Sequence, residues 1–267
     1  MKMLVDIGGT YARFAVAEKG GPKKIIKFTA SDFPTFESAI AAYAEQVGAL
    51  KKMPLLISTA AHPDGKLWRF VNKNKWVIDA SALAKKGFKV EAILNDFEAA
   101  TWGLIGLKDK NVLKPPRAKN ISLASCLIGP GTGLGLGYLV PLKKGHYVQK
   151  TMGGHIPAAS VTAEQELVLQ NVKRLKKRSG AVVYEDLISG FGLMDIYYAF
   201  CQIDSRPPKA RTPEELVERT NEPQVRAALR VFHEFFGIFA ASVTVSGHAF
   251  GGLYLAGGVI DRLTEKN

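Results

Sequence analysis

The sequence is poor in cysteine and has no long uninterrupted apolar run. Its two cysteines, Cys126 and Cys201, lie far apart, with no second cysteine or histidine at metal-ligand spacing. A disulfide framework or a zinc site therefore finds no support, and both thiols are predicted to be small core residues. The most apolar stretch, 235–245, contains a glycine and is too short to cross a bilayer. It predicts a buried helix, and we expect no membrane partner.

The chain also lacks the charged start and apolar core of a secretory signal, because Met1 leads directly into strand-like residues. We therefore expect a cytoplasmic protein. With 47% hydrophobic and 22% charged residues, the composition is that of an ordinary globular protein and excludes disordered and fibrous classes. The length of 267 residues favours one large or two modest domains.

Acidic residues are scarce relative to basic ones. The 24 Asp and Glu residues face 36 Lys and Arg residues, which gives a net charge of +12. A positive field concentrates nucleotides, phosphorylated metabolites or nucleic acid without identifying which. The densest basic run, 173–178, ends a predicted helix over 163–178, where cations suit the helix dipole. A solvated helix end is thus the favoured interpretation over a nucleic-acid contact, and no nucleic-acid partner is expected.

A pattern of strand, glycine turn and strand occurs twice. It covers 4–16 and again 123–140. Each predicts a hairpin whose glycine turn lets backbone N–H groups approach a phosphate. Helical and strand periodicity also predicts the following elements. The predicted helices are 35–47, 81–86, 97–107, 163–178, 190–201, 213–219 and one from 223, and the predicted strands are 54–58, 90–94 and 253–256.

The repeated hairpin predicts two related lobes. We expect a small N-terminal α/β lobe over 1–110 and a larger, helix-rich α/β lobe over 111–267. The Lys- and Pro-rich stretch 108–119 has the composition of an exposed connection between them.

The first glycine turn carries Asp6, Gly8, Gly9 and Thr10. The glycines allow close backbone approach, the threonine offers a hydroxyl, and the Asp6 carboxylate can hold magnesium directly or through water. A plain glycine turn in a hairpin explains the same residues equally well.

The second glycine turn, 129–135, contains Gly131, Thr132 and Gly133. It lacks the Lys-Ser/Thr ending of a P-loop and no helix is predicted after it, so neither the P-loop nor the dinucleotide-binding fingerprint applies. Two phosphate-binding hairpins in separate lobes are more specific than either alone.

Asn95 and Asp96 end a predicted strand, at the edge where open α/β sheets bind ligands. Phosphoryl transfer to a hydroxyl needs a carboxylate that accepts the proton and a neighbouring group that holds the substrate. Asp96 and Asn95 fit these roles. The alternative is that Asp96 caps the helix predicted from Phe97.

Six stretches in chain order resemble the bacterial glucokinases, within the fold group of sugar kinases, actin and heat-shock chaperone ATPases. The resemblance implies an α/β fold of two actin-like, ribonuclease H-like lobes with a cleft between them. The stretches are 6–13 (DIGGTYAR), 95–97 (NDF), 129–135 (GPGTGLG), 153–155 (GGH), Glu185 with Ser189 and Gly190, and 250–258 (FGGLYLAGG).

The resemblance implies a glycolytic activity, ATP-dependent phosphorylation of glucose or a related hexose at its 6-hydroxyl, with magnesium and in a homodimer. It makes Asp96 the general base, with Asn95, His155 and Glu185 on sugar hydroxyls. From the residues alone, His155 could equally pack beside a strand end, and Glu185 could be a surface acid near a helix start. The nucleotide would be held by Asp6, Gly8, Gly9, Thr10, Gly131, Thr132 and Gly133, with Gly257 against the adenosine.

The chain departs from the family pattern at three places. Met152 stands where the family has a sugar-binding Glu, and Tyr11 stands where it has an Asn. The family's sugar-side loop is also altered around Asn72 and Asn74. Family members continue past the turn at Gly257 and Gly258 with a last strand and helix, which we expect this chain to lack. These departures favour a second hypothesis, a non-catalytic or weakly active sugar or nucleotide sensor, whereas the intact Asp6, Asp96 and Glu185 favour the kinase. A sugar-responsive repressor is disfavoured, because cysteines are few and no helix-turn-helix precedes the first strand.

Overall fold

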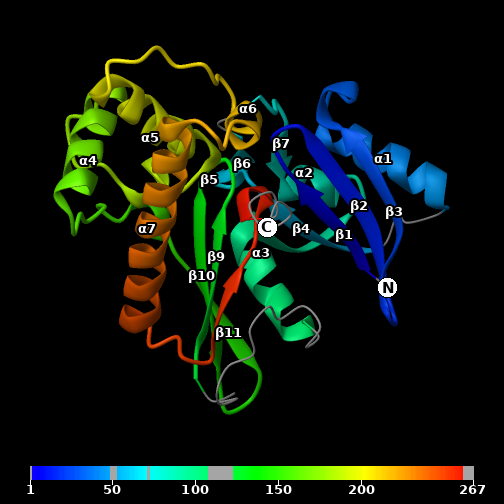
Figure 1. Cartoon of the computed structure of the whole chain (residues 1–267). Coiled ribbons are helices and arrows are strands. Elements are labelled where there is room, and N and C mark those ends of the chain that lie inside the picture. The colour runs from blue at the N-terminus through cyan, green and yellow to red at the C-terminus, as the bar shows by residue number, and fades with distance from the viewer. Residues whose placement is uncertain (1, 49–52, 71–72, 108–122, 261–267) are drawn as a thin grey trace. The chain divides into compact units, whose positions relative to one another are not determined.

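The computed structural model describes residues 2–48, 53–70, 73–107 and 123–260, and it divides into two compact units, 1–100 and 101–267 (Figure 1). The predicted connection at 108–119 lies outside the described residues. Each unit is an α/β structure with its own sheet and its own hydrophobic core.

The first unit is built on a five-stranded mixed sheet with the order β3-β2-β1-β4-β8. Its first three strands form an antiparallel meander, and β4 and β8 run parallel to β1. Alternation along β1 buries Met3, Val5 and Ile7. The strands are β1 (Lys2–Ile7), β2 (Tyr11–Glu18), β3 (Gly21–Thr29), β4 (Pro54–Thr59) and β8 (Lys89–Asn95).

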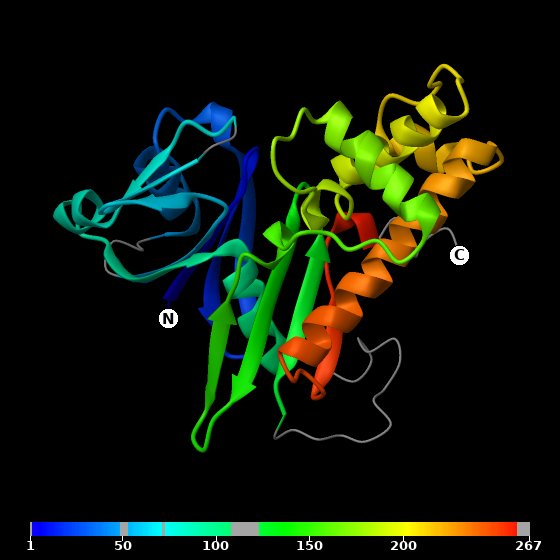
Figure 2. The same cartoon turned by 90° about the vertical axis from the view of Figure 1, so that its left-hand side faces the viewer.

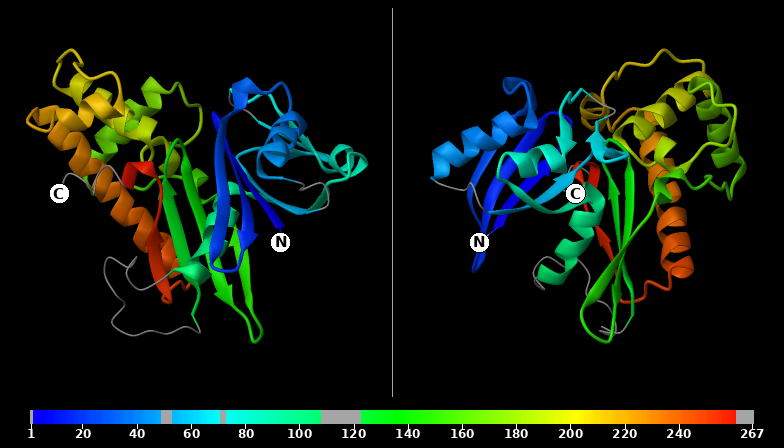
Figure 3. Two further views of the ribbon diagram at one scale, coloured as in Figure 1. Left: turned by 90° about the vertical axis from the view of Figure 1, so that its right-hand side faces the viewer. Right: turned by 180° about the vertical axis from the view of Figure 1, so that it is seen from behind.

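Helix α1 (Phe36–Val47) covers one face of this sheet (Figure 3). Thr35 begins it with a capping box to Ser38. Its Tyr43 ring lies 5.3 Å from that of Phe14 on β2. The remaining elements of this part of the chain are η1 (Ala30–Asp32), β5 (His62–Asp64), β6 (Leu67–Arg69), β7 (Val77–Asp79), α2 (Ala80–Lys85), α3 (Asp96–Gly103) and η2 (Leu104–Gly106).

The second unit repeats the arrangement of four of the five strands of the first sheet. Its four-stranded sheet has the order β11-β10-β9-β12, in which three strands form an antiparallel meander and β12 runs parallel to β9. The predicted duplication is therefore present in the topology as well as in the glycine hairpins. The strands are β9 (Ser125–Pro130), β10 (Leu134–Pro141), β11 (His146–Lys150) and β12 (Gly252–Leu255).

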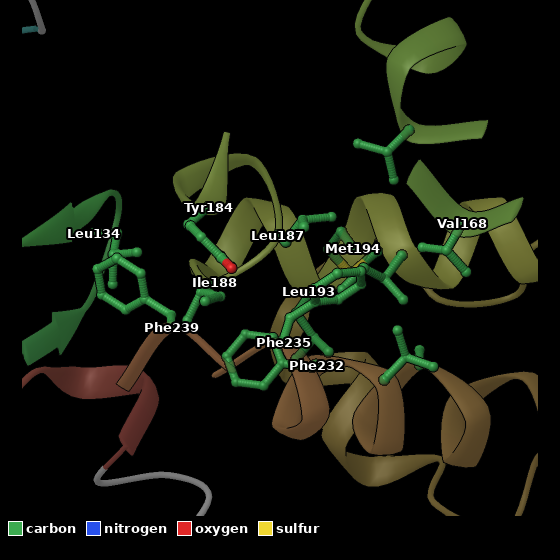
Figure 4. Close-up of a cluster of buried hydrophobic side chains, with 14 of the residues drawn as sticks. Leu134, Val168, Tyr184, Leu187, Ile188, Leu193, Met194, Phe232, Phe235 and Phe239 are labelled. Carbon is green, nitrogen blue, oxygen red and sulfur yellow. The ribbon is translucent and has the colours of Figure 1, made fainter. Parts of the chain in front are cut away.

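Helices cover one face of the second sheet, with the long α7 running beside it (Figure 2). Their shared core includes Phe232, Phe235 and Phe239 of α7, and the Phe239 ring lies 4.9 Å from that of Tyr184 (Figure 4). The helices are α4 (Ala163–Leu175), α5 (Gly190–Ile203), α6 (Pro213–Glu218) and α7 (Pro223–Ser246), with the short turns η4 (Gly153–His155) and η5 (Tyr184–Asp186).

Helix α7 is the one described helix long and apolar enough to cross a membrane by length and composition. Its buried face, which includes Val225 and Val243, is part of the core of the second unit. Gly237 does not interrupt the helix. The expectation of a helix over 235–245 is thus confirmed, but only one face of it is buried, since Val245 is 67% exposed, and the helix extends well beyond that stretch.

Candidate active site

Asp6 lies at the carboxyl end of β1 and is half-exposed. Ser58 Oγ donates to its Oδ1 at 3.1 Å, and Arg13 Nη1 donates to its Oδ2 at 3.1 Å. Arg13 is the cross-strand partner of Asp6 on β2, and Ser58 is its neighbour on β4. The carboxylate is therefore oriented from both adjacent strands.

The turn after Asp6 is held by hydrogen bonds to its backbone. Gly8 N–H donates to Tyr11 O at 2.9 Å, and the buried Asn74 donates from Nδ2 to Gly8 O at 3.0 Å. Gly9 and Thr10 complete the turn, and the Thr10 side chain is exposed. Sequence reasoning left the role of Asn74 open, and the structure gives it a bracing role. Asn72 lies outside the described residues.

Tyr11, the other departure at this turn, begins β2 and is 43% exposed. The ammonium group of Lys27 lies 3.6 Å from the centroid of its ring. This cation–π contact holds the ring against the neighbouring strand β3.

The ends of three parallel strands bring Asp6, Asn95 and Asp96 to one edge of the first sheet. Ile7 pairs with Thr59, and Thr59 pairs with Asn95. Two strand spacings separate β1 from β8, which is about 10 Å. The carboxyl edge therefore presents both acidic residues on the same side, as the strand-end argument predicted.

Asn95 and Asp96 both turn a side-chain oxygen to the start of α3. Phe97 N–H donates to Asp96 Oδ1 at 2.8 Å and to Asn95 Oδ1 at 3.0 Å. The helix-capping alternative is thus realised in the structure. Capping engages Oδ1 of the carboxylate and does not prevent Asp96 from accepting a proton.

The pKa of Asp96 is raised above its ordinary value, and the main cause is burial by surrounding protein, even though part of the residue is exposed. The negative charge of Asp6 raises it further. The hydrogen bond from Phe97 N–H and the positive charge of His62 act in the opposite direction. A carboxylate destabilised in its charged form is a stronger proton acceptor than a free Asp.

The second glycine loop closes between β9 and β10. Gly131 N–H donates to Gly133 O at 2.8 Å, which makes the turn tighter than the predicted 129–135. Gly131 O accepts from Gly190 N–H at 2.9 Å and so ties the loop to the start of α5. Thr132 at the tip is exposed.

Glu185 lies directly against this loop. Its Oε2 accepts from Leu134 N–H at 2.9 Å, and a Cβ at Gly133 would lie 2.5 Å from the same oxygen. Ser189 Oγ donates to Glu185 O at 2.9 Å. Gly133 is therefore needed for close approach of a charged side chain, so Glu185 is more than a surface acid.

The Gly-Gly-His turn forms η4 and packs against β10. A Cβ at Gly154 would lie 2.4 Å from Leu134 O, so the glycines allow the turn to lie flat on the strand. His155 is exposed beyond them rather than packed in the core. Tyr184 N–H donates to Ile156 O at 3.0 Å and joins η4 to η5, so His155 and Glu185 lie on adjoining turns.

A pocket of 860 Å³ lies within the second unit, beside the glycine loop. Gly131, Thr132 and Gly258 line it. Gly257 has a φ of +105°, and a Cβ there would lie 2.5 Å from Pro130 O, so only glycine lets the chain pass this close to β9. The other lining residues are Lys176, Gly190, Phe191, Leu193, Met194, Asp195, Tyr198, Arg211, Thr212, Pro213, Glu214, Val217 and Val259.

The walls of this pocket were not predicted. Lys176 directly follows α4, Asp195 lies on α5, and Arg211 lies two residues before α6, so these residues meet only in the folded chain.

Magnesium fits the donors at Asp6. Mg²⁺ is typically held by one or two carboxylates together with water and substrate phosphates. Asp6 is half-exposed and lies next to the turn that bears the Thr10 hydroxyl. In residues 2–48, 53–70, 73–107 and 123–260 no group of three or more acidic, His or Cys side chains forms a metal cage. A single half-exposed carboxylate beside a hydroxyl suits an ion that a nucleotide would carry.

A sequence model of the glucokinase family matches residues 3–266. The chain belongs to the glucokinase family. It is 31% identical over 273 residues to a glucokinase of Pseudomonas paraeruginosa, covering 100% of this chain and 79% of that protein. It is 30% identical over 272 residues to a glucokinase of Nitrobacter hamburgensis, with 99% and 83% covered.

Solved glucokinases share this fold. A glucokinase from an Antarctic psychrotroph aligns with a TM-score of 0.85 at 24% identity, covering 99% of this chain and 84% of that one. The glucokinase of Balamuthia mandrillaris in complex with glucose aligns at 0.76 and 20% identity, with 100% and 82% covered. A ROK family glucokinase of Streptomyces griseus with glucose and AMPPNP aligns at 0.59 and 21% identity, with 98% and 84% covered. The fold class of sugar kinases is therefore confirmed.

Proposed function

We propose that this member of the family phosphorylates glucose at its 6-hydroxyl with ATP and magnesium, with Asp96 as general base. The observation that carries the proposal is the strand-end group of Asp6, Asn95 and Asp96, in which the pKa of Asp96 is raised. Family membership supports the reaction. Related proteins crystallised with glucose, or with glucose and AMPPNP, support the substrates.

Asp96 would take the proton from the sugar hydroxyl as that oxygen attacks the γ-phosphorus. One of its oxygens is engaged by Phe97 N–H at 2.8 Å, which fixes the carboxylate at the strand end. Positioned general bases contribute about 10²- to 10⁴-fold to rate. Asn95, on the adjoining residue, would hold the sugar in line.

Two glycine loops would hold the phosphates. In the first unit, Gly8, Gly9 and Thr10 follow Asp6, and Asn74 braces the turn. In the second unit, Gly131 and Thr132 line the 860 Å³ pocket, which has room for a nucleoside. Magnesium, when bound with ATP near Asp6, would neutralise charge on the phosphates.

His155 and Glu185 would contact sugar hydroxyls from the second unit. They lie on adjoining turns, and Glu185 is anchored through Leu134 N–H while its second oxygen is not engaged in that bond. The proposal needs both units to act on one pair of substrates. We therefore expect two actin-like lobes that close on the sugar, in a homodimer.

A coupled assay with ATP, magnesium and a panel of hexoses tests the proposal. Asp96→Asn keeps the hydrogen bond to Phe97 N–H but removes the base, so turnover is expected to fall at least about 100-fold with ATP binding retained. Asp64→Asn is the matched control, because Asp64 is exposed and pairs only with Arg69 among the ion pairs of the described chain.

The second candidate, a sugar or nucleotide sensor, is favoured by Met152, which is 67% exposed next to the Gly-Gly-His turn. A thioether cannot accept strong hydrogen bonds from sugar hydroxyls. Binding of ATP and sugar without turnover in both wild type and Asp96→Asn would support the sensor and reject the kinase.

A further inference from the structure

The pocket of the second unit has two chemically different ends. At one end are Gly131 and Thr132, fixed to the first residue of α5 by the bond from Gly190 N–H. Asp195 and Tyr198 line the same pocket five and eight residues further along that helix. At 1.5 Å per residue these positions lie about 7.5 Å and about 12 Å from the loop along the helix axis.

An ion pair lies partway along the pocket, at the level of Asp195. Lys176 Nζ is 3.2 Å from Asp195 Oδ2 and 3.3 Å from Asp186 Oδ1. Asp186 is buried and is itself bonded to Arg178 and to Val183 N–H. The lysine is therefore held from the protein interior, and it fixes Asp195 on the wall of the pocket.

Asp195 has capacity for further donors. Its side chain is 20% exposed, and in the described ranges Lys176 is its one ion-pair partner, through Oδ2 alone. Burial raises the pKa of Asp195, and the charge of Lys176 opposes this. A carboxylate that is desolvated and only partly compensated gains from each additional hydrogen bond.

We propose that Asp195 accepts hydrogen bonds from the 2′- and 3′-hydroxyls of the nucleotide's ribose, with Lys176 as its positioning residue. The inference rests on the proposed function, which puts the phosphates of ATP at Gly131 and Thr132. The ribose follows the phosphates along the nucleotide, which matches the intermediate place of Asp195 on α5. Acidic side chains bind ribose hydroxyls in this manner, and the Tyr198 ring lies beyond, at the level of the base.

Equilibrium binding without sugar separates this inference from catalysis. Isothermal titration would compare ATP with 2′-deoxy-ATP on wild type and on Asp195→Asn. Wild type is expected to bind ATP about tenfold or more tightly than 2′-deoxy-ATP, the usual effect of one charge-assisted hydrogen bond. Asp195→Asn is expected to lose a similar factor for ATP and to bind both nucleotides alike.

Two further variants make the result specific. Asp204→Asn is the matched control, because Asp204 caps the other end of α5, is bonded to Gln224 at 2.8 Å and does not line the pocket. It should keep the preference for ATP. Lys176→Met should weaken ATP binding, and Lys176→Arg should restore part of it.

The outcomes distinguish the two proposals. Binding with the expected preference but no phosphorylation of any hexose would support the ribose contact and reject the kinase. Phosphorylation by a wild type that binds both nucleotides equally would reject the ribose contact alone. A lower melting temperature of Asp195→Asn with an unchanged preference would show that the ion pair only joins α4 to α5, and would overturn the inference. No binding of ATP would overturn both.

Discussion

At the scale of single residues, two structural features meet at Asp96. It accepts a hydrogen bond from Phe97 at the start of α3, and it lies in surroundings that disfavour its charge. The first fixes its direction, and the second raises its affinity for a proton. Capping and catalysis are therefore compatible uses of one carboxylate.

The raised pKa of Asp96 predicts the acid side of the pH profile. Because the base must be unprotonated, kcat/KM should fall as the pH falls through this pKa, at a midpoint above the ordinary value of about 3.9. His62 lowers the pKa of Asp96, so His62→Gln should move the midpoint to higher pH. The measurement is initial rate against pH at subsaturating glucose. A midpoint at or below the ordinary Asp value would contradict the assignment.

Met152 predicts weak sugar binding that a single change can improve. Its side chain is 67% exposed, and the residue directly precedes the turn of His155. Met152→Glu should lower the KM for glucose by roughly tenfold to 100-fold, the equivalent of a charge-assisted hydrogen bond of about 1.5–3 kcal/mol. Met152→Gln is the control for side-chain length. An unchanged KM for the Glu variant would show that position 152 does not face the sugar.

The candidate site residues within the motifs could be predicted from sequence, but the residues that orient them through hydrogen bonds could not. Asp6 and Asp96 follow apolar runs, so strand ends place them at one edge. Ser58 and Asn74 orient this edge through hydrogen bonds that span 52 and 66 residues. No local pattern marks such partners, because only the strand register and the loop path bring them to the site.

At the scale of elements, helices were predicted well because residues that can cap a helix mark where each one begins. Thr35 and Thr162 accept hydrogen bonds from the third residue of their helices, and the observed starts follow them directly. The predicted end of α4 at Arg178 is wrong. The helix stops at Leu175, since Lys177 has a φ of +50° and Arg178 turns to bind Asp186.

Sequence reasoning missed five of the described strands: the short β5, β6 and β7, which form a three-stranded sheet, and the longer β3 and β11. β3 and β11 lie at sheet edges, and most of their residues are exposed, so neither shows a regular alternation of apolar and polar residues. Their pairing with β2 and β10 defines them. Such strands depend on their neighbours rather than on their own composition.

Replacing two glycines of the second unit by alanine should have different effects, one on KM and one on stability. A Cβ at Gly133 would meet the flexible end of Glu185, so Gly133→Ala should displace that side chain and raise KM values with little loss of stability. A Cβ at Gly154 would meet the backbone oxygen of Leu134, which cannot move aside. Gly154→Ala should therefore cost about 1–3 kcal/mol of stability.

Thermal melts and steady-state kinetics on both variants check this contrast. Gly180→Ala is the control, because a Cβ there would meet no atom within 4 Å, and its effect should stay within about 0.5 kcal/mol. If Gly133→Ala unfolded the protein while Gly154→Ala left it unchanged, the description of both close contacts would be wrong.

At the scale of the whole molecule, one topology is used twice with different cores. The core cluster of the first unit lies within residues 3–88, and that of the second lies within 126–249. The first is rich in strand residues, and the second is filled largely from helices. The duplicated hairpins were visible in the sequence, whereas the pocket walls arose from helices present in the second unit alone.

The buried carboxylate of Asp186 predicts how the second unit responds to acid. Burial alone would raise the pKa of Asp186, but the two-point contact with Arg178, the bond from Val183 N–H and the charge of Lys176 bring it below its ordinary value. The stabilisation is thus fully present above the unfolded pKa of about 3.9, and it is lost as the pH falls through the lower, folded value.

Asp186→Asn should therefore lower stability at pH 7 by about 1–3 kcal/mol, less than for a fully buried pair because Arg178 and Lys176 are partly exposed and can hydrate. The difference from wild type should shrink below about pH 4. Denaturant titrations at several pH values measure it, with Asp204→Asn, at the exposed residue directly after α5, as the control. A difference that stayed constant down to strongly acidic pH would mean that the loss comes from packing at position 186, since only the charged form of this carboxylate joins the two cations to the backbone of η5.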